Sequence, residues 1–324
     1  MMKFGLIGLA LIGLGAGAAS ALLFASVASG SLLSVFLFYL APLPIMIAAI
    51  GWSHWIAGIA TLVASISLAI SLGTVFCLAY LVGTGAPAWW LGYLAMLARP
   101  GGNGAAGTLE WYPPGRLVLW AATLAVLVVI VAIFNLGTDI DTFRAGLREA
   151  LGHIIAIGNG RATGGPESPN VSRLVDFLIA AIPPGAAVLA TITNLFNLWL
   201  AARIVKFSGL LQRPWPALPA LDFPMSASIA LAAAIALSFL GNIVGLIATA
   251  LMAALLMAYA VLGFAVLHTL TRGMSARPFV LGGVYGLVSV FGWPLIALCL
   301  LGLLEAAIGL RQRFGGRGGP PAPT

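Results

Sequence analysis

Apolar segments long enough to cross a lipid bilayer follow one another along almost the whole chain. A helix needs about 20 mainly apolar residues to cross the ~30 Å hydrocarbon core. Only 7% of the 324 residues are charged and 61% are hydrophobic, whereas soluble domains carry roughly 25% charged residues. A water-soluble fold is therefore excluded, and the sequence predicts an all-α, polytopic bundle of transmembrane helices. The segments cover residues 4–25, 31–51, 55–73, 75–97, 116–136, 178–203, 226–241, 243–269 and 279–308.

The number of crossings is predicted to be about nine, within a range of eight to ten. Residues 23–31 hold no charge, and Gly241 and Asn242 interrupt one long apolar run. The final segment, residues 279–308, contains Pro294. At about 1.5 Å per residue, this segment is too long for one untilted helix and too short for two complete crossings. We therefore expect Pro294 to kink the segment or to end a half-helix.

The first 28 residues imitate a secretory signal peptide, with Lys3, an apolar run and then small residues that end at Ala28. The apolar run extends from Phe4 to about Ala25. This is longer than the roughly 7–15 apolar residues of a signal peptide, and it is long enough to cross a membrane. We expect the segment to be retained as the first transmembrane helix.

Lys and Arg outnumber Asp and Glu by 15 to 8, which gives the chain a net charge of +7. In membrane proteins such an excess marks the cytoplasmic loops, and the N-terminus with Lys3 is predicted to lie on that side. With nine crossings, the loop 138–173 and the C-terminal arginines would fall on the opposite side. A paired final segment would return the tail to the cytoplasm. Because no basic run with interleaved aromatic residues is present, nucleic-acid binding is not expected.

The chain is predicted to contain two transmembrane halves that are separated by one polar loop. Residues 1–136 form an N-terminal half of about five helices, and residues 171–310 form a C-terminal half of four or five helices. The loop 137–170 is predicted to hold an amphipathic helix in the headgroup plane, capped by Asp139, and then a Gly-rich stretch from Ile157 to Pro169. Residues 311–324 form a basic tail that is predicted to be disordered. The apolar face of the amphipathic helix carries Ile140, Phe143, Leu147, Leu151 and Ile154.

Amide side chains inside the predicted crossings are the candidates for a binding site. Asn194 and Asn197 lie one turn apart, and an amide that faces lipid is unfavourable, so both are expected to point into the bundle. They would either bond neighbouring helices or line a cavity, and both interpretations stay open. Helix-breaking prolines free backbone groups that can bind a solute. The residues predicted to line a solute cavity are Pro42, Pro44, Asn194, Asn197 and Asn242.

Two further features concern contacts between helices and charges near the membrane boundary. Gly13, Gly17 and Ala21 recur every four residues, and such stripes allow helices to approach closely. They serve ordinary internal packing or form a docking face for another membrane protein. Glu305 lies six residues before Arg311. An interfacial ion pair between them and a proton relay through Glu305 are the two interpretations of this carboxyl group.

The sequence contains no recognisable catalytic or metal-binding motif. Its three histidines are scattered, and Cys77 and Cys299 both lie within apolar segments, where they are expected to act as packing residues. No nucleophile elbow, Walker A sequence or close pair of embedded carboxylates is present. We therefore expect no enzyme activity, no cofactor and no metal ion.

Landmark residues recur along nearly the whole chain, and they include Pro42, Pro44, Trp52, Trp89, Trp90, Glu110, Trp111, Pro183, Pro184, Trp215 and Glu305. In their order they resemble the YybS-like family of predicted bacterial membrane proteins, which has no assigned activity. This resemblance implies a multi-pass protein of the bacterial inner (plasma) membrane. The Pro-x-Pro helix and the Gly-rich helices after it are similar to the N-terminal half of S components, the substrate-binding subunits of energy-coupling-factor vitamin transporters. That likeness implies that the stripe in the first helix docks onto a coupling subunit.

The leading functional hypothesis is capture or transport of a small hydrophobic or vitamin-like solute within the bilayer. The alternative is a scaffold that transports nothing and binds other membrane proteins through its small-residue faces. A third possibility, an enzyme of envelope lipids, requires a cavity that joins Glu305 or Asp176 to a second polar group. The identity of the solute does not follow from the sequence.

Overall fold

The computed structural model describes residues 5–101, 109–158, 169–216 and 221–314, and nearly all of its regular structure is helical. The one sheet within these ranges is a two-stranded antiparallel hairpin of β1 (Ala98–Pro100) and β2 (Leu109–Trp111), in which Arg99 pairs with Glu110. The helices are α1 (Leu6–Ala25), η1 (Ser26–Ser29), α2 (Leu32–Tyr39), α3 (Pro42–Gly51), α4 (His54–Leu72), α5 (Thr74–Tyr80), η2 (Leu81–Gly85), α6 (Ala86–Ala95), α7 (Pro114–Leu136), α8 (Ile140–Gly158), α9 (Pro169–Phe207), α10 (Met225–Ser238), α11 (Ile243–Leu270), α12 (Arg277–Phe291), α13 (Pro294–Ile308) and α14 (Leu310–Phe314).

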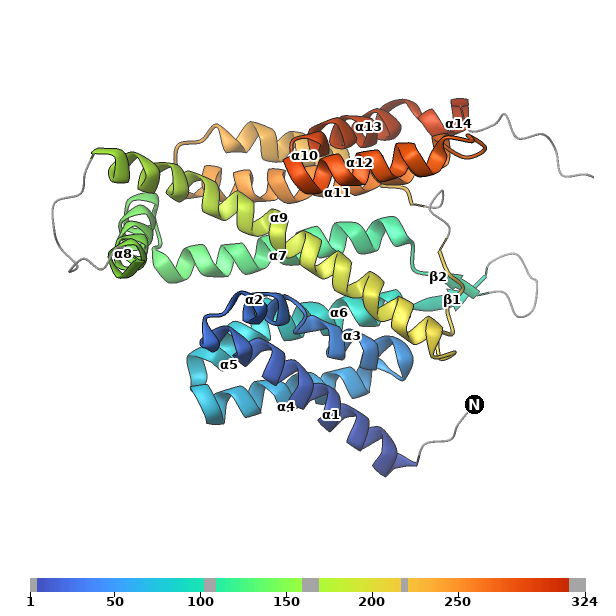
Figure 1. The fold of residues 1–324 in the computed structure, drawn as a ribbon, viewed down its shortest axis with the longest axis horizontal. Coiled ribbons are helices and arrows are strands. Elements are labelled where there is room, and N and C mark those ends of the chain that lie inside the picture. The colour runs from blue at the N-terminus through green and yellow to red at the C-terminus, as the bar shows by residue number, and fades with distance from the viewer. Residues whose placement is uncertain (1–4, 102–108, 159–168, 217–220, 315–324) are drawn as a thin grey trace, which may run out of the picture.

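The helices form three layers (Figure 1). Helices α1 to α6 make the lower layer, α7 and α9 cross the middle, and α10 to α14 make the upper layer. One apolar core joins α7, α8, α9, α10 and α11, and a second joins α3, α4 and α6 to α7 and to the C-terminal part of α9. Helix α9 therefore contributes to both cores and connects the outer layers.

Seven helical segments are long and apolar enough to cross a membrane in the described part of the chain. They correspond to the predicted segments 4–25, 31–51, 55–73, 75–97, 116–136, 178–203 and 243–269. The prediction of about nine crossings is not confirmed. The predicted segment 226–241 is the short helix α10, and 279–308 is divided between two short helices.

The final apolar segment is broken as the sequence predicts. Helix α12 ends at Phe291, Gly292 adopts a φ of +69°, and α13 begins with Pro294. A left-handed φ is readily available only to glycine, and proline starts a helix without needing a backbone N–H partner. At 15 residues, each helix is about 22 Å long, which is short for the ~30 Å hydrocarbon core. Figure 1 shows α12 and α13 running in opposite directions.

The bundle has two distinct ends. We call the end with β1, β2, the C-terminus of α9, the α11–α12 loop and α14 the hairpin end, and the opposite end, with α8, the α8 end (Figure 1). The described Lys and Arg residues are unequally divided between them. The hairpin end carries Arg99, Arg116, Arg203, Lys206, Arg213, Arg272, Arg277, Arg311 and Arg313, and the α8 end carries Arg144, Arg148 and Arg173.

The position of α14 removes one of the two conflicts in the charge distribution, while Arg144, Arg148 and Arg173 remain at the α8 end. With nine crossings the C-terminal arginines fall on the same side as the loop 138–173, but the reversal between α12 and α13 places α14 at the hairpin end. Helix α14 also shows that residues 311–314, the start of the tail predicted to be disordered, are helical. Hydrogen bonds from Arg311 to Glu305 fix this turn. The rest of the tail lies outside the described residues.

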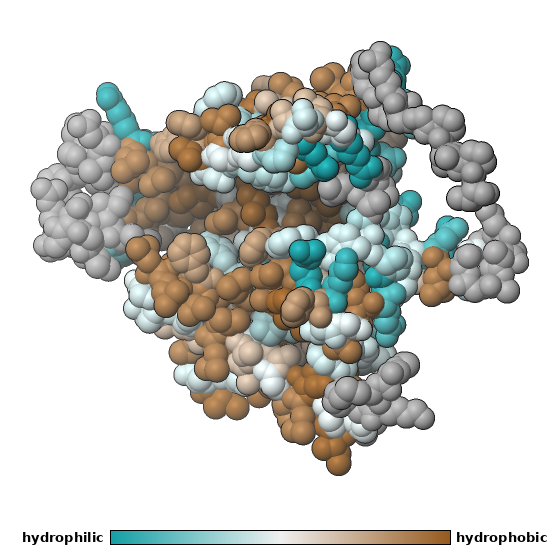
Figure 2. Space-filling model, turned by 45° about the vertical axis from the view of Figure 1, so that its right-hand side comes forward, coloured by the Kyte–Doolittle hydropathy of each residue, from teal (hydrophilic) through white to brown (hydrophobic). Residues whose placement is uncertain are grey.

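The surface between the two ends is apolar. Figure 2 shows hydrophobic residues over the middle of the visible face and hydrophilic side chains gathered mainly toward its right-hand side. Large apolar side chains such as Ile70, Phe207 and Phe279 are more than four-fifths exposed, at 83%, 96% and 84%. Soluble monomers rarely expose apolar surface on this scale, so the described surface fits a lipid environment.

Candidate functional site

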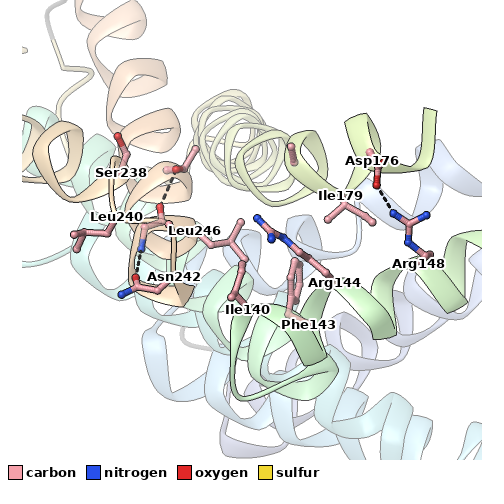
Figure 3. A pocket seen from close by; sticks show the side chains of 14 residues that line it. Ile140, Phe143, Arg144, Arg148, Asp176, Ile179, Ser238, Leu240, Asn242 and Leu246 are labelled. Atoms are coloured by element: carbon pink, nitrogen blue, oxygen red, sulfur yellow. Dashed lines mark hydrogen bonds and ion pairs between the residues drawn. The ribbon is translucent and has the colours of Figure 1, made fainter. Parts of the chain in front are cut away.

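A cavity of about 650 Å³ lies at the α8 end, where α8, α9, the end of α10 and the start of α11 meet (Figure 3). Its size falls within the range of roughly 300–1,000 Å³ that is typical of small-molecule sites. Apolar and polar side chains share the lining. The lining residues are Ile140, Phe143, Arg144, Arg148, Asp176, Ile179, Ala180, Ser238, Leu240, Gly241, Asn242, Gly245, Leu246 and Thr249.

Helix α8 forms one wall of the cavity, and its amphipathic pattern fixes its position. Phe143 and Leu147 are 2% and 8% exposed and belong to the core that includes α9 and α11, whereas Arg144 is exposed. Figure 1 shows α8 lying across the ends of the long helices, as a helix in the headgroup plane would. Of the predicted Gly-rich stretch from Ile157 to Pro169, residues 159–168 lie outside the described residues.

The start of α8 is capped as the sequence predicts. The carboxylate of Asp139 accepts hydrogen bonds from the backbone N–H groups of Asp141 and Thr142, both at 3.0 Å, and from the Thr142 hydroxyl at 2.9 Å. The hydrogen bonds from the backbone and the hydroxyl of Thr142 hold the pKa of Asp139 below its ordinary value. This cap anchors the first turn of the helix that carries Arg144 and Arg148.

The two arginines of α8 play different roles at the cavity. Arg148 forms an ion pair with Asp176 of α9. Figure 3 shows the guanidinium of Arg144 extending into the space between Ile179 of α9 and Leu246 of α11. In the described ranges, no hydrogen bond or ion pair to the Arg144 guanidinium is present. Arg144 therefore presents a positive charge to the cavity, whereas the charge of Arg148 is balanced by the carboxylate.

The opposite wall supplies neutral polar groups. Asn242 caps α11, because its side-chain oxygen accepts hydrogen bonds from the N–H groups of Val244 and Gly245 at 3.0 and 3.2 Å. This leaves the Asn242 amide nitrogen as a donor. The hydroxyls of Ser238 and Thr249 donate to backbone carbonyls of their own helices. Their oxygens keep lone pairs that can accept hydrogen bonds.

These groups make an amphipathic site with one unbalanced cation. An apolar ligand body would contact Ile140, Phe143, Ile179 and Leu246, and an anionic group would reach Arg144. The Asp176 carboxylate is already paired, so it is not poised as a free base. Across the residues that the structure describes, no three His, Cys, Asp or Glu side chains come together as a metal site would need. The arrangement is suited to binding.

A family model for a predicted membrane protein, DUF2232, matches residues 18–304. The chain belongs to this family. The family description and the apolar helices agree that this member is a multi-pass membrane protein. No curated protein and no solved structure matches the chain.

The predicted solute-lining residues are divided between two places. Asn242 lines the cavity at the α8 end. Asn197 and Asn194 are 0% and 6% exposed and face neighbouring helices. The side-chain nitrogen of Asn194 donates to the Ala121 carbonyl of α7 at 3.4 Å, and that of Asn197 donates to the Tyr39 carbonyl of α2 at 2.8 Å. In this arrangement the two amides act as bonds between helices.

The break at Pro42 and Pro44 explains why Asn197 contacts Tyr39. Neither proline has an N–H group, so carbonyls at the end of α2 lose their helical partners. The N–H of Leu43 bonds the Leu40 carbonyl at 3.0 Å, which leaves the Tyr39 and Ala41 carbonyls to side chains. Asn197 binds the first, and the Ser20 hydroxyl of α1 binds the second at 2.6 Å. Asn197 therefore contacts the helix break at the prolines, and the Tyr39 and Ala41 carbonyls both accept hydrogen bonds from side chains.

The small-residue stripe of α1 lies against α4. A side chain at Gly17 would collide with the Ala60 carbonyl, and Gly13 lies beside Ile59. Ala21 is 7% exposed. This face is therefore occupied within the chain, and a partner subunit would need another surface.

Glu305 and Arg311 form a shielded ion pair at the hairpin end. The Arg311 side chain donates to Glu305 at 2.8 Å, and the two side chains are only 10% and 7% exposed. The Arg311 backbone N–H also donates to the carboxylate, at 2.9 Å. Glu305 does not line the described cavity, whereas Asp176 does.

The position of Arg144 at the cavity was not predicted from the sequence. The helical period places Arg144 on the polar face of α8, where a solvated arginine is the ordinary interpretation. Nothing in the sequence shows that the α10–α11 turn approaches that face. A useful signal was the interruption at Gly241 and Asn242, because Asn242 begins α11 at the cavity wall.

Proposed function

We propose that this protein captures a small amphipathic solute with an anionic group in the cavity at the α8 end. The observation that supports this proposal is the unbalanced guanidinium of Arg144, which faces a cavity lined by apolar side chains. The proposed ligand still belongs to the class of vitamin-like solutes that the sequence suggests. The proposed site, however, lies at the α8 end and not at Pro42, Pro44, Asn194 and Asn197. After capture, the solute would either be transported by this protein or be passed to a partner protein, as the resemblance to S components implies.

We also propose that the hairpin end faces the cytoplasm of a bacterial inner membrane. The excess of Lys and Arg at that end supports this orientation, because cytoplasmic loops of membrane proteins are enriched in these residues. The chain entering α1 would then lie in the cytoplasm. The cavity would open on the outer face, where a solute arrives before uptake.

The test measures how a panel of vitamin-like carboxylates and their neutral amides changes the thermal unfolding of purified protein in lipid nanodiscs. Lipoate and lipoamide make a suitable first pair, because they differ in the charged group and share the apolar part. We expect at least one carboxylate to raise the unfolding midpoint while its amide does not. A ligand that binds only the folded protein stabilises it.

Two variants locate the binding site. Arg144→Gln is expected to weaken binding of the active carboxylate by roughly tenfold to a hundredfold, because a charge-assisted hydrogen bond is lost. Arg173→Gln removes an exposed charge from the same end outside the cavity lining and should leave binding unchanged. Equal weakening in both variants, or no stabilisation by any carboxylate, would contradict the proposal. If no carboxylate stabilises the protein and a membrane partner co-purifies in stoichiometric amount, the alternative function as a scaffold would be favoured.

A further inference from the structure

Two cations near the C-terminus of α9 share a single indole ring. The Arg203 guanidinium carbon lies 5.5 Å from the centre of the Trp215 ring, and the Lys206 ammonium lies 4.9 Å from it. Arg203 also lies 5.9 Å from the Trp199 ring. Both cations are exposed, and neither forms an ion pair with a carboxylate in the described part of the chain. The ring attracts each cation, but the two positive charges repel each other.

An exposed apolar stripe runs along α9 and ends at these cations. Its members recur at intervals of three and four residues, so they lie on the same helix face as Arg203. Each side chain is more than a third exposed. The stripe consists of Leu189 at 43%, Ile192 at 38%, Phe196 at 48% and Trp199 at 51%.

The location fits the headgroup level of the membrane. Helix α9 is one of the helices long and apolar enough to cross the bilayer, and its C-terminus lies at the hairpin end. Trp residues prefer the interface, and long basic side chains reach toward it. Phe207, next to Lys206, is 96% exposed and extends the apolar contact.

We propose that Arg203, Lys206 and Trp215 bind the phosphate of an anionic phospholipid whose acyl chain lies along the apolar stripe of α9. The two cations would share the phosphate, which reduces their mutual repulsion, and Trp215 holds both of them toward it. A free phosphate would use only the cations and would leave the apolar stripe without a role. The site is independent of the cavity at the α8 end, since none of its residues line that cavity.

The experiment compares lipid binding by the full-length, detergent-purified protein in native mass spectrometry. Dioleoyl phosphatidylglycerol and dioleoyl phosphatidylcholine are titrated separately, because they share acyl chains and differ in net charge. We expect the first phosphatidylglycerol molecule to bind about tenfold more tightly than phosphatidylcholine. The variant with Arg203→Gln and Lys206→Gln should lose this preference.

A charge-matched control separates a specific site from the general field of the hairpin end. Arg272→Gln with Arg313→Gln removes the same charge from exposed positions at that end and should keep the preference. Trp215→Leu leaves both cations in place and should weaken the preference, with an unchanged thermal midpoint showing that the fold is intact. Retention of the preference by the Arg203 and Lys206 variant, or equal loss in the control, would overturn the proposal. Displacement of the lipid by millimolar inorganic phosphate would also overturn it, because the site would then recognise phosphate alone.

Discussion

At the scale of single residues, buried polar side chains donate hydrogen bonds to backbone carbonyls where the helices are broken. Asn197 binds the Tyr39 carbonyl, because the N–H of Leu43, its partner in a continuous helix, bonds the Leu40 carbonyl instead. The sequence predicts that Asn194 and Asn197 face inward, because an amide in lipid is unfavourable. It does not reveal that their partners are backbone carbonyls, since Tyr39 is far from Asn197 along the chain. Asn197 therefore contacts the helix break before Pro42 through a backbone carbonyl, and the solute cavity at these residues stays a prediction.

Replacing Asn197 tests this structural role. Asn197→Leu should lower the free energy of unfolding by roughly 1–3 kcal/mol, because it leaves the half-buried Tyr39 carbonyl without this partner. Asn135→Leu is the matched control, since Asn135 is exposed and its hydrogen bond within the described part of the chain goes to the Val131 carbonyl of its own helix. Denaturant unfolding in detergent micelles measures both variants. An equal, small change in the two would show that the Asn197 bond contributes no special stability.

The cap at Asp139 gives a prediction about pH. The folded protein holds the pKa of Asp139 below its ordinary value, so the cap is fully present above about pH 4 and is lost as the pH falls through the lower, folded pKa. A spin label at Ala145→Cys on α8 reports the mobility of the helix. We expect mobility to rise in acid more in this protein than in one that also carries Asp139→Asn, because neutral Asn caps without titrating. Identical acid profiles would argue against a role for the carboxylate.

At the scale of elements, α8 depends on its apolar face. Leu147 is 8% exposed within the core, whereas Ala145 is exposed. Leu147→Asp should destabilise the packing of α8 by roughly 2–5 kcal/mol or more, because it removes a buried side chain and introduces a charge. Ala145→Asp adds the same charge on the solvent side and should change little. The mobility of a spin label at Ala150→Cys, another exposed position on α8, distinguishes the two variants, and similar mobility in both would contradict the position of this helix.

The final apolar segment shows what sequence patterns reveal about elements and what they miss. Proline chemistry predicts the break at Pro294, and Gly292 supplies the left-handed turn before it. The direction of α13 after the break depends on its packing against α11 and α12, which involves contacts between separate segments. The same limit applies to the cavity, because α8 and the start of α11 are distant in the sequence.

At the scale of the whole molecule, the two ends differ in both charge and architecture. Apolar runs predict most of the crossings, because a bilayer imposes the same length on every spanning helix. The excess of basic residues at the hairpin end becomes larger because the reversal between α12 and α13 places α14 there. We therefore expect the α11–α12 loop and α14 to share one side of the membrane, with α8 on the other.

Single cysteines in a protein with Cys77→Ala and Cys299→Ala test this arrangement most directly. Ser275→Cys lies in the α11–α12 loop, Gln312→Cys lies in α14 and Ala145→Cys lies in α8, and all three positions are exposed. A thiol reagent that does not cross membranes is applied to sealed vesicles of each orientation. We predict that Ser275→Cys and Gln312→Cys react from the cytoplasmic side and Ala145→Cys from the opposite side. Reaction of Gln312→Cys from the same side as Ala145→Cys would contradict it.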